Sequence, residues 1–145
     1  MIHVVVAVYN RLNLTINCLN RLSLQKNFDD LNLIVVDDGS TDGTSEYIKK
    51  NFKNITIVKG DGNLFSAGCF HLAIEYILKI GRPDDWILLV SNDSEISENT
   101  IVELKKCSEN KNRKILSGAL AVKLDDKNTV IRSGTIVKSW FFNKT

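Results

Sequence analysis

Two adjacent carboxylates at the end of a short apolar run constrain the fold of this chain more than any other feature. The run Leu33–Val36 is too short for a helix and rich in β-branched residues, so it predicts a strand buried on both faces, as in a parallel sheet. Asp37 and Asp38 follow where that strand should end. Ligands bind at the carboxyl ends of strands in open α/β sheets, so both acids are candidates for a functional site.

The residues after the two acids predict a turn and then a helix. Gly39 permits a sharp turn, and the helix that follows should begin near Gly43. Its cap can come from any of three residues: Ser40, Thr41 or Asp42. An acidic loop with an ordinary helix cap would account for the same residues without a ligand. We favour the functional interpretation because a pair of acids, a turn and a cap follow the strand directly.

The same alternation of apolar runs and helical spacing continues along the chain. The residues predicted to form strands are Ile2 to Val8, Leu33 to Val36, Ile55 to Val58 and Trp86 to Val90, with two further strand-like runs at Ile115 to Val122 and Val130 to Val137. Helical periodicity lies between the first strands and is clearest from Phe65 to Ile80. This order predicts an α/β fold with a mainly parallel sheet flanked by helices, in a single domain over residues 1–145.

Composition limits the classes of protein to which the chain can belong. At 145 residues it is long enough for one domain with a real core, and its net charge of +2 gives no basic footprint for nucleic acid. Cys18, Cys69 and Cys107 are odd in number and widely spaced, which favours reduced thiols in the core and no structural zinc. No signal peptide or membrane span is evident, so we expect a cytoplasmic protein.

Polar residues follow three of the predicted strands, and parallel strands end at one edge of their sheet. Tyr9-Asn10, Asp37-Asp38 and Asn92-Asp93 should therefore meet there, together with the glycine-rich loop from Gly60 to Ser66. Carboxylates beside a glycine-rich backbone suit a phosphate-bearing ligand held through Mg²⁺ or Mn²⁺, which prefer carboxylate and phosphate oxygens. His71 falls just after this loop, and a role in the site and a solvated helix face both stay open for it.

Two better-known phosphate-binding motifs are absent. The chain contains no GxxxxGK[ST] sequence, which excludes a P-loop nucleotidase. Gly60-x-Gly62 lacks the third glycine of a dinucleotide fingerprint, and it follows the third predicted strand where that fingerprint should follow the first. The glycine loop therefore belongs to another kind of site.

Four motifs follow one another along the chain: VVVAVYNR, LIVVDDGSTDGT, GNLFSAGCFHLAI and WILLVSNDSEI. In this order and spacing they resemble the nucleotide-sugar-binding half of family-2 glycosyltransferases with a GT-A fold, and the resemblance covers nearly the whole chain. Within this family, the sequence is similar to bacterial enzymes that transfer rhamnose, galactose or glucose during surface-polysaccharide assembly. The resemblance implies a Rossmann-like GT-A sheet and a nucleoside diphosphate sugar as ligand, with UDP- and dTDP-sugars the first expectation.

The resemblance also implies roles for individual residues. The nucleoside would lie against the backbone of Ala7, Val8 and Tyr9. Asp38 would hydrogen-bond the base, with Asp37 beside it. The other residues implied to approach the base, ribose or phosphates are Gly62, Asn63, Gly68 and Asn92.

Asp93 corresponds to the metal-binding carboxylate of the family. It would bind the Mn²⁺ or Mg²⁺ that bridges the diphosphate and neutralises the charge growing on the departing nucleoside diphosphate. The motif reads Asn92-Asp93-Ser94, which leaves one firm carboxylate and Glu95 as a second. The sequence departs from the family at two further positions, with Ala7 in place of a small polar residue and His71 in place of an asparagine.

The acceptor half of the family has no counterpart in this sequence. Family members generally continue beyond this length, with an acceptor site and a carboxylate general base. No residue after Asp93 offers an obvious base, because Asp125 and Asp126 are typical of a hairpin turn, so the catalytic residue is unassigned. The apolar end Trp140–Phe142 should pack against something and offers a surface for a homodimer. We therefore expect a chain truncated at its acceptor part.

These observations lead to one main hypothesis and two alternatives. The main hypothesis is a metal-dependent, inverting glycosyltransferase that transfers a hexose to a hydroxyl of a glycan or lipid-linked acceptor in polysaccharide biosynthesis. If such an enzyme associates with a membrane, we expect it at the inner face as a peripheral protein. The first alternative is a non-catalytic nucleotide-sugar-binding module, or an inactive fragment, that self-associates. The second is a sugar nucleotidyltransferase, which would need a glycine-rich basic loop where Tyr9–Leu12 stands.

Overall fold

The computed structural model describes residues 1–26, 30–111, 121–122 and 130–132. The chain divides into two compact units, Met1–Thr100 and Ile101–Thr145. The elements of the first unit are β1 (Ile2–Val8), α1 (Leu12–Ser23), β2 (Leu31–Asp37), α2 (Thr44–Asn51), β3 (Ile55–Lys59), α3 (Phe65–Ile80) and β4 (Trp86–Ser91). They are followed by α4 (Thr100–Lys111), β5 (Ala121–Val122) and β6 (Val130–Arg132).

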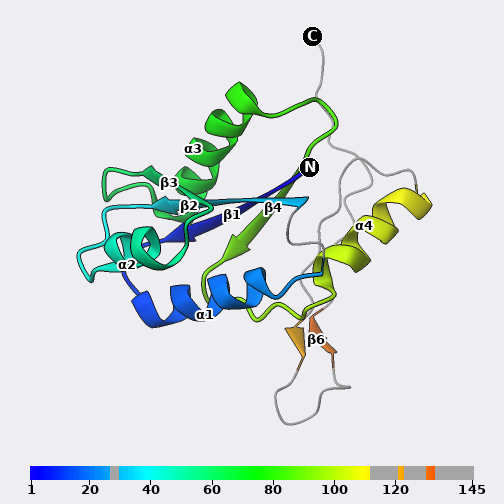
Figure 1. The fold of residues 1–145 in the computed structure, drawn as a ribbon, viewed down its shortest axis with the longest axis horizontal. Helices are drawn as coiled ribbons and strands as arrows, with labels where there is room; N and C mark the ends of the chain where they lie inside the picture. Colours follow the sequence, from blue (N-terminus) through cyan, green and yellow to red (C-terminus); the bar gives the residue numbers. More distant parts are fainter. Residues whose placement is uncertain (27–29, 112–120, 123–129, 133–145) are drawn as a thin grey trace. The chain divides into compact units, whose positions relative to one another are not determined.

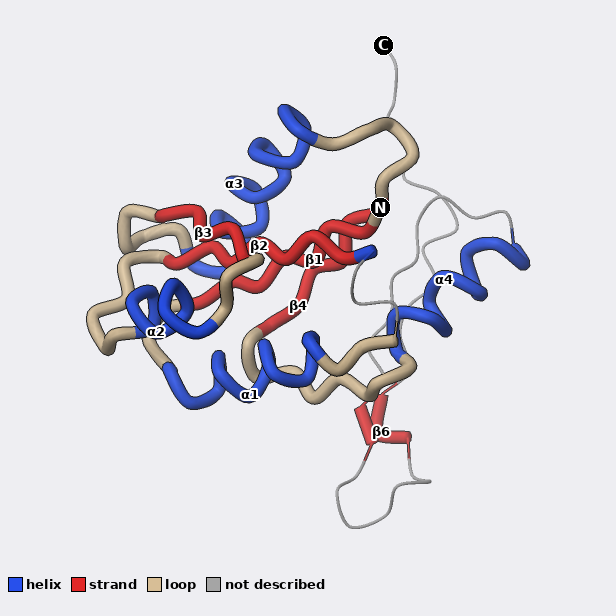
Figure 2. The backbone as a smooth tube through the Cα atoms, in the orientation of Figure 1, coloured by secondary structure: helices blue, strands red, loops and turns tan. Residues whose placement is uncertain are grey.

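The first unit is built on a four-stranded parallel sheet with the strand order β3-β2-β1-β4. Figure 1 shows α1 and α2 on one face of this sheet and α3 on the other. The loop after β2 therefore leads to one face, and the loop after β3 leads to the opposite face. A crevice opens where neighbouring strands send their loops to opposite faces, and in α/β sheets this is where ligands bind. Figure 2 shows the loops that leave β1, β2 and β3 gathered at one edge of the sheet.

The core follows from the alternation of side chains along the two central strands. Val5, Ile34 and Val36 are buried against residues of α3, among them Cys69 and Ala73. The residues between them on β1 and β2 point to the face that carries α1 and α2, and all of these are buried: Val4, Val6, Val8, Leu33 and Val35. Because both faces are covered, the two strands consist almost entirely of apolar residues.

The edge strand β4 is not covered on both faces. Its run is continuously apolar, yet the side chains of Ile87 and Leu89 are exposed. Leu89 pairs in register with Val5 and so shares the face on which α3 lies. Within the first unit, helix α3 packs mainly on β1 and β2 and does not bury this face of β4.

The structure confirms the predicted α/β architecture and the bounds of two of its elements. Strand β1 and helix α3 have the predicted limits, and the other strands of the sheet are longer than predicted by one to three residues. Strands β5 and β6 pair in antiparallel fashion inside the last two predicted runs. The predicted turn at 124–128, with Asp125 and Asp126, lies outside the described residues, as does the apolar end at 140–142. The single-domain organisation stays a prediction.

A hydrogen-bonded cluster ties together the amino ends of the strands. The Asp85 carboxylate accepts hydrogen bonds from the backbone N–H of Arg82 at 2.8 Å and from the Met1 ammonium at 3.0 Å. The oxygen that accepts the Arg82 N–H also lies 3.1 Å from Nε2 of the buried His3, whose Nδ1 lies 2.9 Å from the side-chain amide nitrogen of Asn32. The Arg82 N–H and the Met1 ammonium, more than the burial that opposes them, lower the pKa of Asp85 to about 2.

None of the described helices combines the length and the apolar composition that crossing a membrane requires.

Candidate functional site

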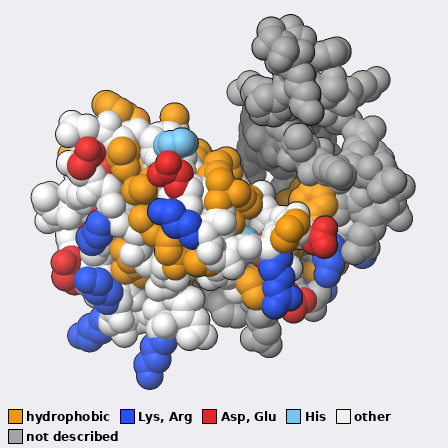
Figure 3. Space-filling view, turned by 90° about the horizontal axis from the view of Figure 1, so that it is seen from above, with side chains coloured by type: hydrophobic (Ala, Val, Ile, Leu, Met, Phe, Trp, Pro, Cys, Tyr) orange, Lys and Arg blue, Asp and Glu red, His pale blue; other side chains and the backbone are white. Residues whose placement is uncertain are grey.

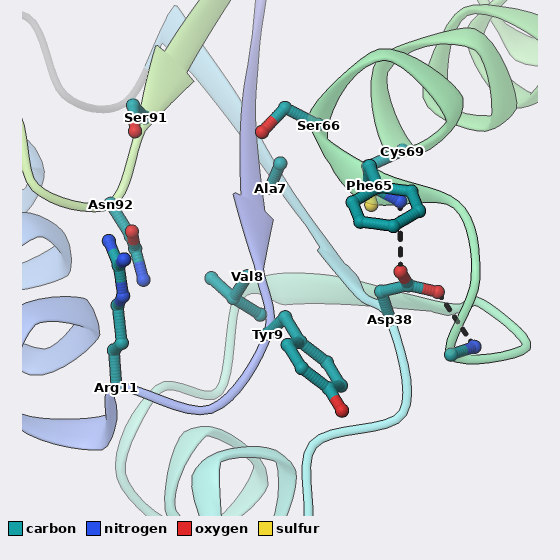
Figure 4. Close-up of a pocket in the computed structure, with 11 residues that line it drawn as sticks. Ala7, Val8, Tyr9, Arg11, Asp38, Phe65, Ser66, Cys69, Ser91 and Asn92 are labelled. Carbon is teal, nitrogen blue, oxygen red and sulfur yellow. Dashed lines mark hydrogen bonds between the residues drawn. The ribbon is translucent and has the colours of Figure 1, made fainter.

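A cavity of about 310 Å³ lies at the carboxyl ends of the central strands. Figure 4 shows that β1, the β3–α3 region and the end of β4 surround it. Its lining consists of Ala7, Val8, Tyr9, Arg11, Asp38, Gly62, Phe65, Ser66, Cys69, Ser91 and Asn92. The cavity therefore occupies the position at which the strand-end residues were predicted to meet.

Asp38 fixes the loop that follows β3. One of its carboxylate oxygens accepts the backbone N–H of Gly62 at 2.8 Å. The other accepts the N–H groups of Leu64 at 2.9 Å and of Phe65 at 3.1 Å, which are the first free amides at the start of α3. A side chain at Gly60 would place its Cβ 2.5 Å from the Asp38 carboxylate, so this close approach requires glycine. The buried acid thus shapes one wall of the cavity.

Asp37 points to the opposite face of the sheet and does not line the cavity. Its side chain is fully buried and accepts hydrogen bonds from the Ser40 backbone N–H at 2.8 Å, the Ser45 hydroxyl and the Lys59 ammonium at 2.9 Å. Burial by itself raises the pKa of Asp37, but the hydrogen bonds from Ser40, Ser45 and Lys59 outweigh it and lower the pKa to about 2. Asp37 therefore joins β2, α2 and β3 as a buried anion.

The turn after β1 is held by the turn after β2. The Asn10 backbone N–H donates to the Ser40 hydroxyl at 2.8 Å, and the Asn10 side-chain oxygen accepts the Thr41 N–H at 2.9 Å. Asn10 and Arg11 both have left-handed backbones, with φ of 55° and 60°. Such conformations are uncommon for residues other than glycine and persist where surrounding bonds impose them. The turn brings Arg11 to the cavity.

One carboxylate serves the first turns of two helices. The residues just before α1 and α2 are Arg11 and Gly43, and neither makes a side-chain cap. Asp42 supplies the missing acceptors, since one oxygen accepts the Leu12 N–H at 2.8 Å and the other accepts the Thr44 N–H at 3.1 Å. Of the three residues predicted to cap the second helix, Asp42 is the one whose carboxylate binds its first amide.

Two aromatic side chains line the cavity with most of their surface exposed. Tyr9 follows β1 and is 56% exposed, and Phe65 begins α3 and is 83% exposed. Figure 4 shows both rings at the cavity, with the Asp38 carboxylate close to them. Exposed aromatic rings around a cavity suit a flat, partly apolar ligand.

Asn92 lines the cavity on the side away from Asp38, and Asp93 follows Asn92 directly in the sequence. The side chain of Asn92 is buried and donates to the Thr15 hydroxyl at 3.1 Å. Asp93 is exposed, accepts the Ser91 hydroxyl at 2.5 Å and lies 3.6 Å from the Arg11 guanidinium. Asn92 and Asp93 also line a second cavity of about 320 Å³ beside α1, which Glu95 and Arg21 share.

The carboxylates beside the cavity suit a metal ion only if a bound phosphate-bearing ligand supplies further oxygen ligands. Among the described residues no group of three His, Cys, Asp or Glu side chains is placed to hold a metal. Asp93 offers one exposed carboxylate next to the cavity, and Mg²⁺ or Mn²⁺ needs only one or two carboxylates when phosphate oxygens and water complete its shell. Asp93 therefore suits a cation that is also bound by a phosphate-bearing ligand. Binding of the cation would require the ion pair between Asp93 and Arg11 to break.

The structure brings together six of the ten residues proposed for the site. Those lining the cavity are Ala7, Val8, Tyr9, Asp38, Gly62 and Asn92. Asp93 borders the second cavity, and Asn63 lies in the same loop as Gly62 without lining either cavity. Gly68 faces Leu64, whose Cβ would lie 2.9 Å from an added Cβ. Asp37 is turned away.

Five lining residues were not singled out from the sequence: Arg11, Phe65, Ser66, Cys69 and Ser91. Ser66 and Cys69 are three residues apart and so share a face of α3, which is a signal that helical spacing alone could have given. Ser91 and Arg11 each adjoin a residue that was singled out. Phe65 carried no such signal, because an aromatic residue at a helix start is normally taken for core.

The two cysteines whose side chains are described, Cys18 and Cys69, are buried thiols. Burial, with Asp93 nearby, raises the pKa of Cys18 to about 11, and burial, with Asp38 and Asp37 nearby, raises the pKa of Cys69 to about 11. Both are buried, as predicted for core thiols, whereas the side chain of Cys107 lies outside the described part.

His71 is exposed on α3, with Nε2 3.6 Å from Glu75, and does not line the cavity. Figure 3 shows a face of the molecule on which hydrophobic, basic and acidic side chains are mixed. Of the two interpretations left open for His71, the structure favours the solvated helix face.

A family model described as "Glycosyl transferase family 2" matches residues 3–145. No curated protein matches the chain significantly. The match therefore rests on the pattern of the whole family and extends over nearly all of the sequence.

Solved structures share the fold. S. aureus TarS 1–349 in complex with UDP has a TM-score of 0.66 at 18% identity, covering 86% of this chain and 42% of that one. The same protein with UDP-GlcNAc has a TM-score of 0.61 at 19% identity, with 86% and 41% covered. The mannosyltransferase PcManGT from Pyrobaculum calidifontis, with GDP-Man and Mn²⁺, has a TM-score of 0.65 at 20% identity, with 84% and 35% covered. The chain thus spans less than half the length of each.

Proposed function

The chain belongs to glycosyl transferase family 2, and from this premise we propose that its cavity binds the nucleoside diphosphate sugar from which a glycosyltransferase takes its sugar. The observation that carries the proposal is the cavity at the carboxyl ends of β1, β2 and β4, between Asp38 and Asn92. The similar structures were solved with UDP, UDP-GlcNAc or GDP-Man, which supports a ligand of this class. UDP- and dTDP-sugars are our first candidates.

We assign the two sides of the cavity to the two ends of the nucleotide. Tyr9 and Asp38 offer a ring and a carboxylate, which suit a nucleobase with hydrogen-bond donors on its edge. Asp38 accepts three backbone N–H bonds, and a carboxylate has about four acceptor positions, so one position is left for the base. Arg11 and the buried Asn92 line the other side, and the exposed Asp93 lies 3.6 Å from the Arg11 guanidinium, so charge would meet the diphosphate there.

Asp93 would hold Mn²⁺ or Mg²⁺ together with the diphosphate. When bound, the cation supplies positive charge that stabilises the departing nucleoside diphosphate. The Arg11 guanidinium now lies 3.6 Å from the Asp93 carboxylate. This ion pair is exposed and contributes little free energy, so a cation can take the place of the guanidinium. Arg11 is then free to turn toward the phosphates, because its side chain lines the cavity.

The reaction that we propose is inverting transfer of a hexose to a hydroxyl of a glycan or lipid-linked acceptor, in polysaccharide or glycan biosynthesis. A carboxylate base would deprotonate the hydroxyl, and the alkoxide would attack the anomeric carbon and displace the nucleoside diphosphate. The contribution of the residues described here is to bind and orient the donor so that its anomeric carbon is presented at the cavity mouth.

The test is a calorimetric titration of the chain with UDP, dTDP and GDP, each with and without Mn²⁺. We expect one nucleotide to bind saturably and more tightly with Mn²⁺. In Asp93→Ala the gain from Mn²⁺ should fall by about tenfold or more, since even the partners of metal ligands contribute that much to metal affinity.

Asp84→Ala is the matched control, because Asp84 is an exposed carboxylate that lines neither cavity. It should bind the nucleotide as the wild type does. Failure of all three nucleotides to bind the folded wild-type chain in the presence of Mn²⁺ would exclude the proposed donor site. Binding that Mn²⁺ does not alter would exclude the metal-dependent form of the proposal.

A further inference from the structure

Phe65 is the most exposed large hydrophobic side chain in the described part of the chain, at 83%. It lies at the first residue of α3 and lines the cavity. A phenylalanine in this place gains little from the core, because most of its ring is in contact with water. Its position therefore needs an explanation other than packing.

The backbone of Phe65 is held in a conformation that its side chain disfavours. Its φ is 52°, in the left-handed region, where a bulky aromatic residue is a genuine outlier. The Asp38 carboxylate accepts the Phe65 N–H at 3.1 Å and the Leu64 N–H at 2.9 Å, which fixes this conformation. Strained residues of this kind persist where the surroundings impose them, and they concentrate at binding sites. The ring is thus presented to the cavity at a cost in stability.

The second ring of the cavity, Tyr9, comes from β1. Both rings lie on the same side of the cavity as Asp38 and away from Asn92 (Figure 4). The ring contact that the structure gives within its described residues is between Tyr47 and Phe52, so Tyr9 and Phe65 are not stacked on each other. Each ring keeps a face available for a ligand.

We propose that Phe65 is an aromatic platform on which the nucleobase of the donor stacks, next to the Asp38 carboxylate that reads the edge of the base. This inference rests on the function proposed above and deepens it by naming the residue that grips the base. Stacking on a ring requires no particular donor or acceptor, so Phe65 contributes affinity to every base, whereas Asp38 selects among them. The left-handed backbone and its bonds to Asp38 set the direction of the ring.

The experiment compares Phe65→Ala and Phe65→Trp with the wild type. The probes are the nucleoside diphosphate that binds most tightly and inorganic diphosphate, both with Mn²⁺. Phe65→Ala should weaken nucleotide binding by about 5- to 20-fold, the lower part of the range for base–aromatic stacking, and leave diphosphate binding unchanged. Phe65→Trp should bind within about twofold of the wild type, because the ring is retained. Leu78→Ala is the control, since Leu78 is 76% exposed on the same helix and lies outside the cavity.

Phe65→Gly separates the ring from the backbone. Glycine adopts a positive φ without strain, so this variant should melt at the same temperature as the wild type or higher, yet bind the nucleotide as weakly as Phe65→Ala. Weakened binding that came from unfolding of the loop would instead lower the melting temperature and diphosphate binding together.

Two results would overturn the inference. Unchanged nucleotide affinity in Phe65→Ala would show that the ring does not contact the base, while the proposed function would still stand. Equal losses for the nucleotide and for diphosphate would assign Phe65 a structural role. Absence of nucleotide binding in the wild type would instead remove the proposed function and this inference together.

Discussion

Asp37 and Asp38 are adjacent in the sequence, and their carboxylates lie on opposite faces of the sheet. One step along a strand reverses the direction of the side chain. Asp37 thereby reaches Ser45 of α2 and the Lys59 ammonium, and Asp38 reaches the loop that begins α3. The two acids that first indicated a site therefore divide their roles, with one stabilising the fold and the other shaping the cavity.

Asp37→Asn should lower the free energy of unfolding by about 2 kcal/mol at pH 7, because the pKa of Asp37 is about 2 in the folded chain against an ordinary value near 3.8. A lowered pKa stabilises the fold above the unfolded-state pKa and loses this effect as the pH falls through the folded one. The difference between wild type and variant should therefore be constant above about pH 5 and shrink between about pH 4 and 2. Urea unfolding at several pH values measures it.

The exposed Asp84 provides the comparison for Asp37. Asp84→Asn removes a carboxylate that is exposed to solvent and should change stability by no more than about 0.5 kcal/mol at any of these pH values. A difference between wild type and Asp37→Asn that persisted unchanged at pH 2 would contradict the assignment of Asp37 as a buried anion in the folded chain.

Residues that end strands were predictable from the sequence, and residues that begin a helix were not. An apolar strand followed by polar residues locates Tyr9, Asp38 and Asn92 at one edge of the sheet without further information. The direction of Phe65 depends on a left-handed backbone that Asp38 imposes from 27 positions earlier in the chain. No local pattern encodes such a bond, and this is why the most exposed ring of the cavity was missed.

At the scale of elements, the loops after the strands are fastened to one another by side chains. Asn10 joins the turn after β1 to the turn after β2, and Asp42 satisfies the first amides of both α1 and α2. Asp38 then joins β2 to the loop after β3 and to the start of α3. The cavity wall is thus fixed by three polar side chains before any ligand binds.

Asp38→Ala should release the loop that follows β3. Its carboxylate accepts the N–H groups of Gly62, Leu64 and Phe65, and a hydrogen bond to a charged group contributes about 1.5–3 kcal/mol. Hydrogen exchange of these three amides should accelerate about tenfold or more, with smaller changes in the centre of the sheet. The measurement is native-state exchange followed amide by amide.

Asp61→Ala is the control within the same loop. Its carboxylate accepts the Asn63 N–H at 2.9 Å and lies exposed, so any faster exchange should be confined to Asn63. If Leu64 and Phe65 kept their protection in Asp38→Ala, the acid could not be the group that holds this wall of the cavity.

The order of elements was available from the sequence because each strand is a run of one kind of residue. The burial of β4 was not, since it depends on how far α3 extends across the sheet. A sequence shows that Ile87 and Leu89 are apolar, and only the packing of α3 over β1 and β2 shows that it leaves them uncovered. Propensity gives the element, and the neighbours decide which of its faces is buried.

At the scale of the sheet unit, the two ends of the strands have separate tasks. The carboxyl ends form the cavity with Asp38 and Asn92, and the amino ends are held by the Asp85 cluster with His3 and the Met1 ammonium. The core of β1 and β2 lies between these ends and is almost entirely apolar. Stability and ligand binding should therefore respond to different substitutions, because groups at distant sites contribute independently.

Asp85→Asn and Asp93→Ala test this separation in opposite directions. Asp85→Asn should lower the free energy of unfolding at pH 7, an effect that shrinks as the pH falls from about 4 to 2 because the folded-state pKa of Asp85 is about 2. Its nucleotide affinity should stay within about twofold of wild type, since Asp85 is remote from the cavity lining.

Asp93→Ala should melt at the same temperature as the wild type, because the partners of Asp93 are exposed. It should nevertheless lose the gain in nucleotide affinity that Mn²⁺ gives. Thermal melts and calorimetry on both variants decide the matter: parallel losses of stability and affinity in each would mean that the two ends of the sheet are coupled.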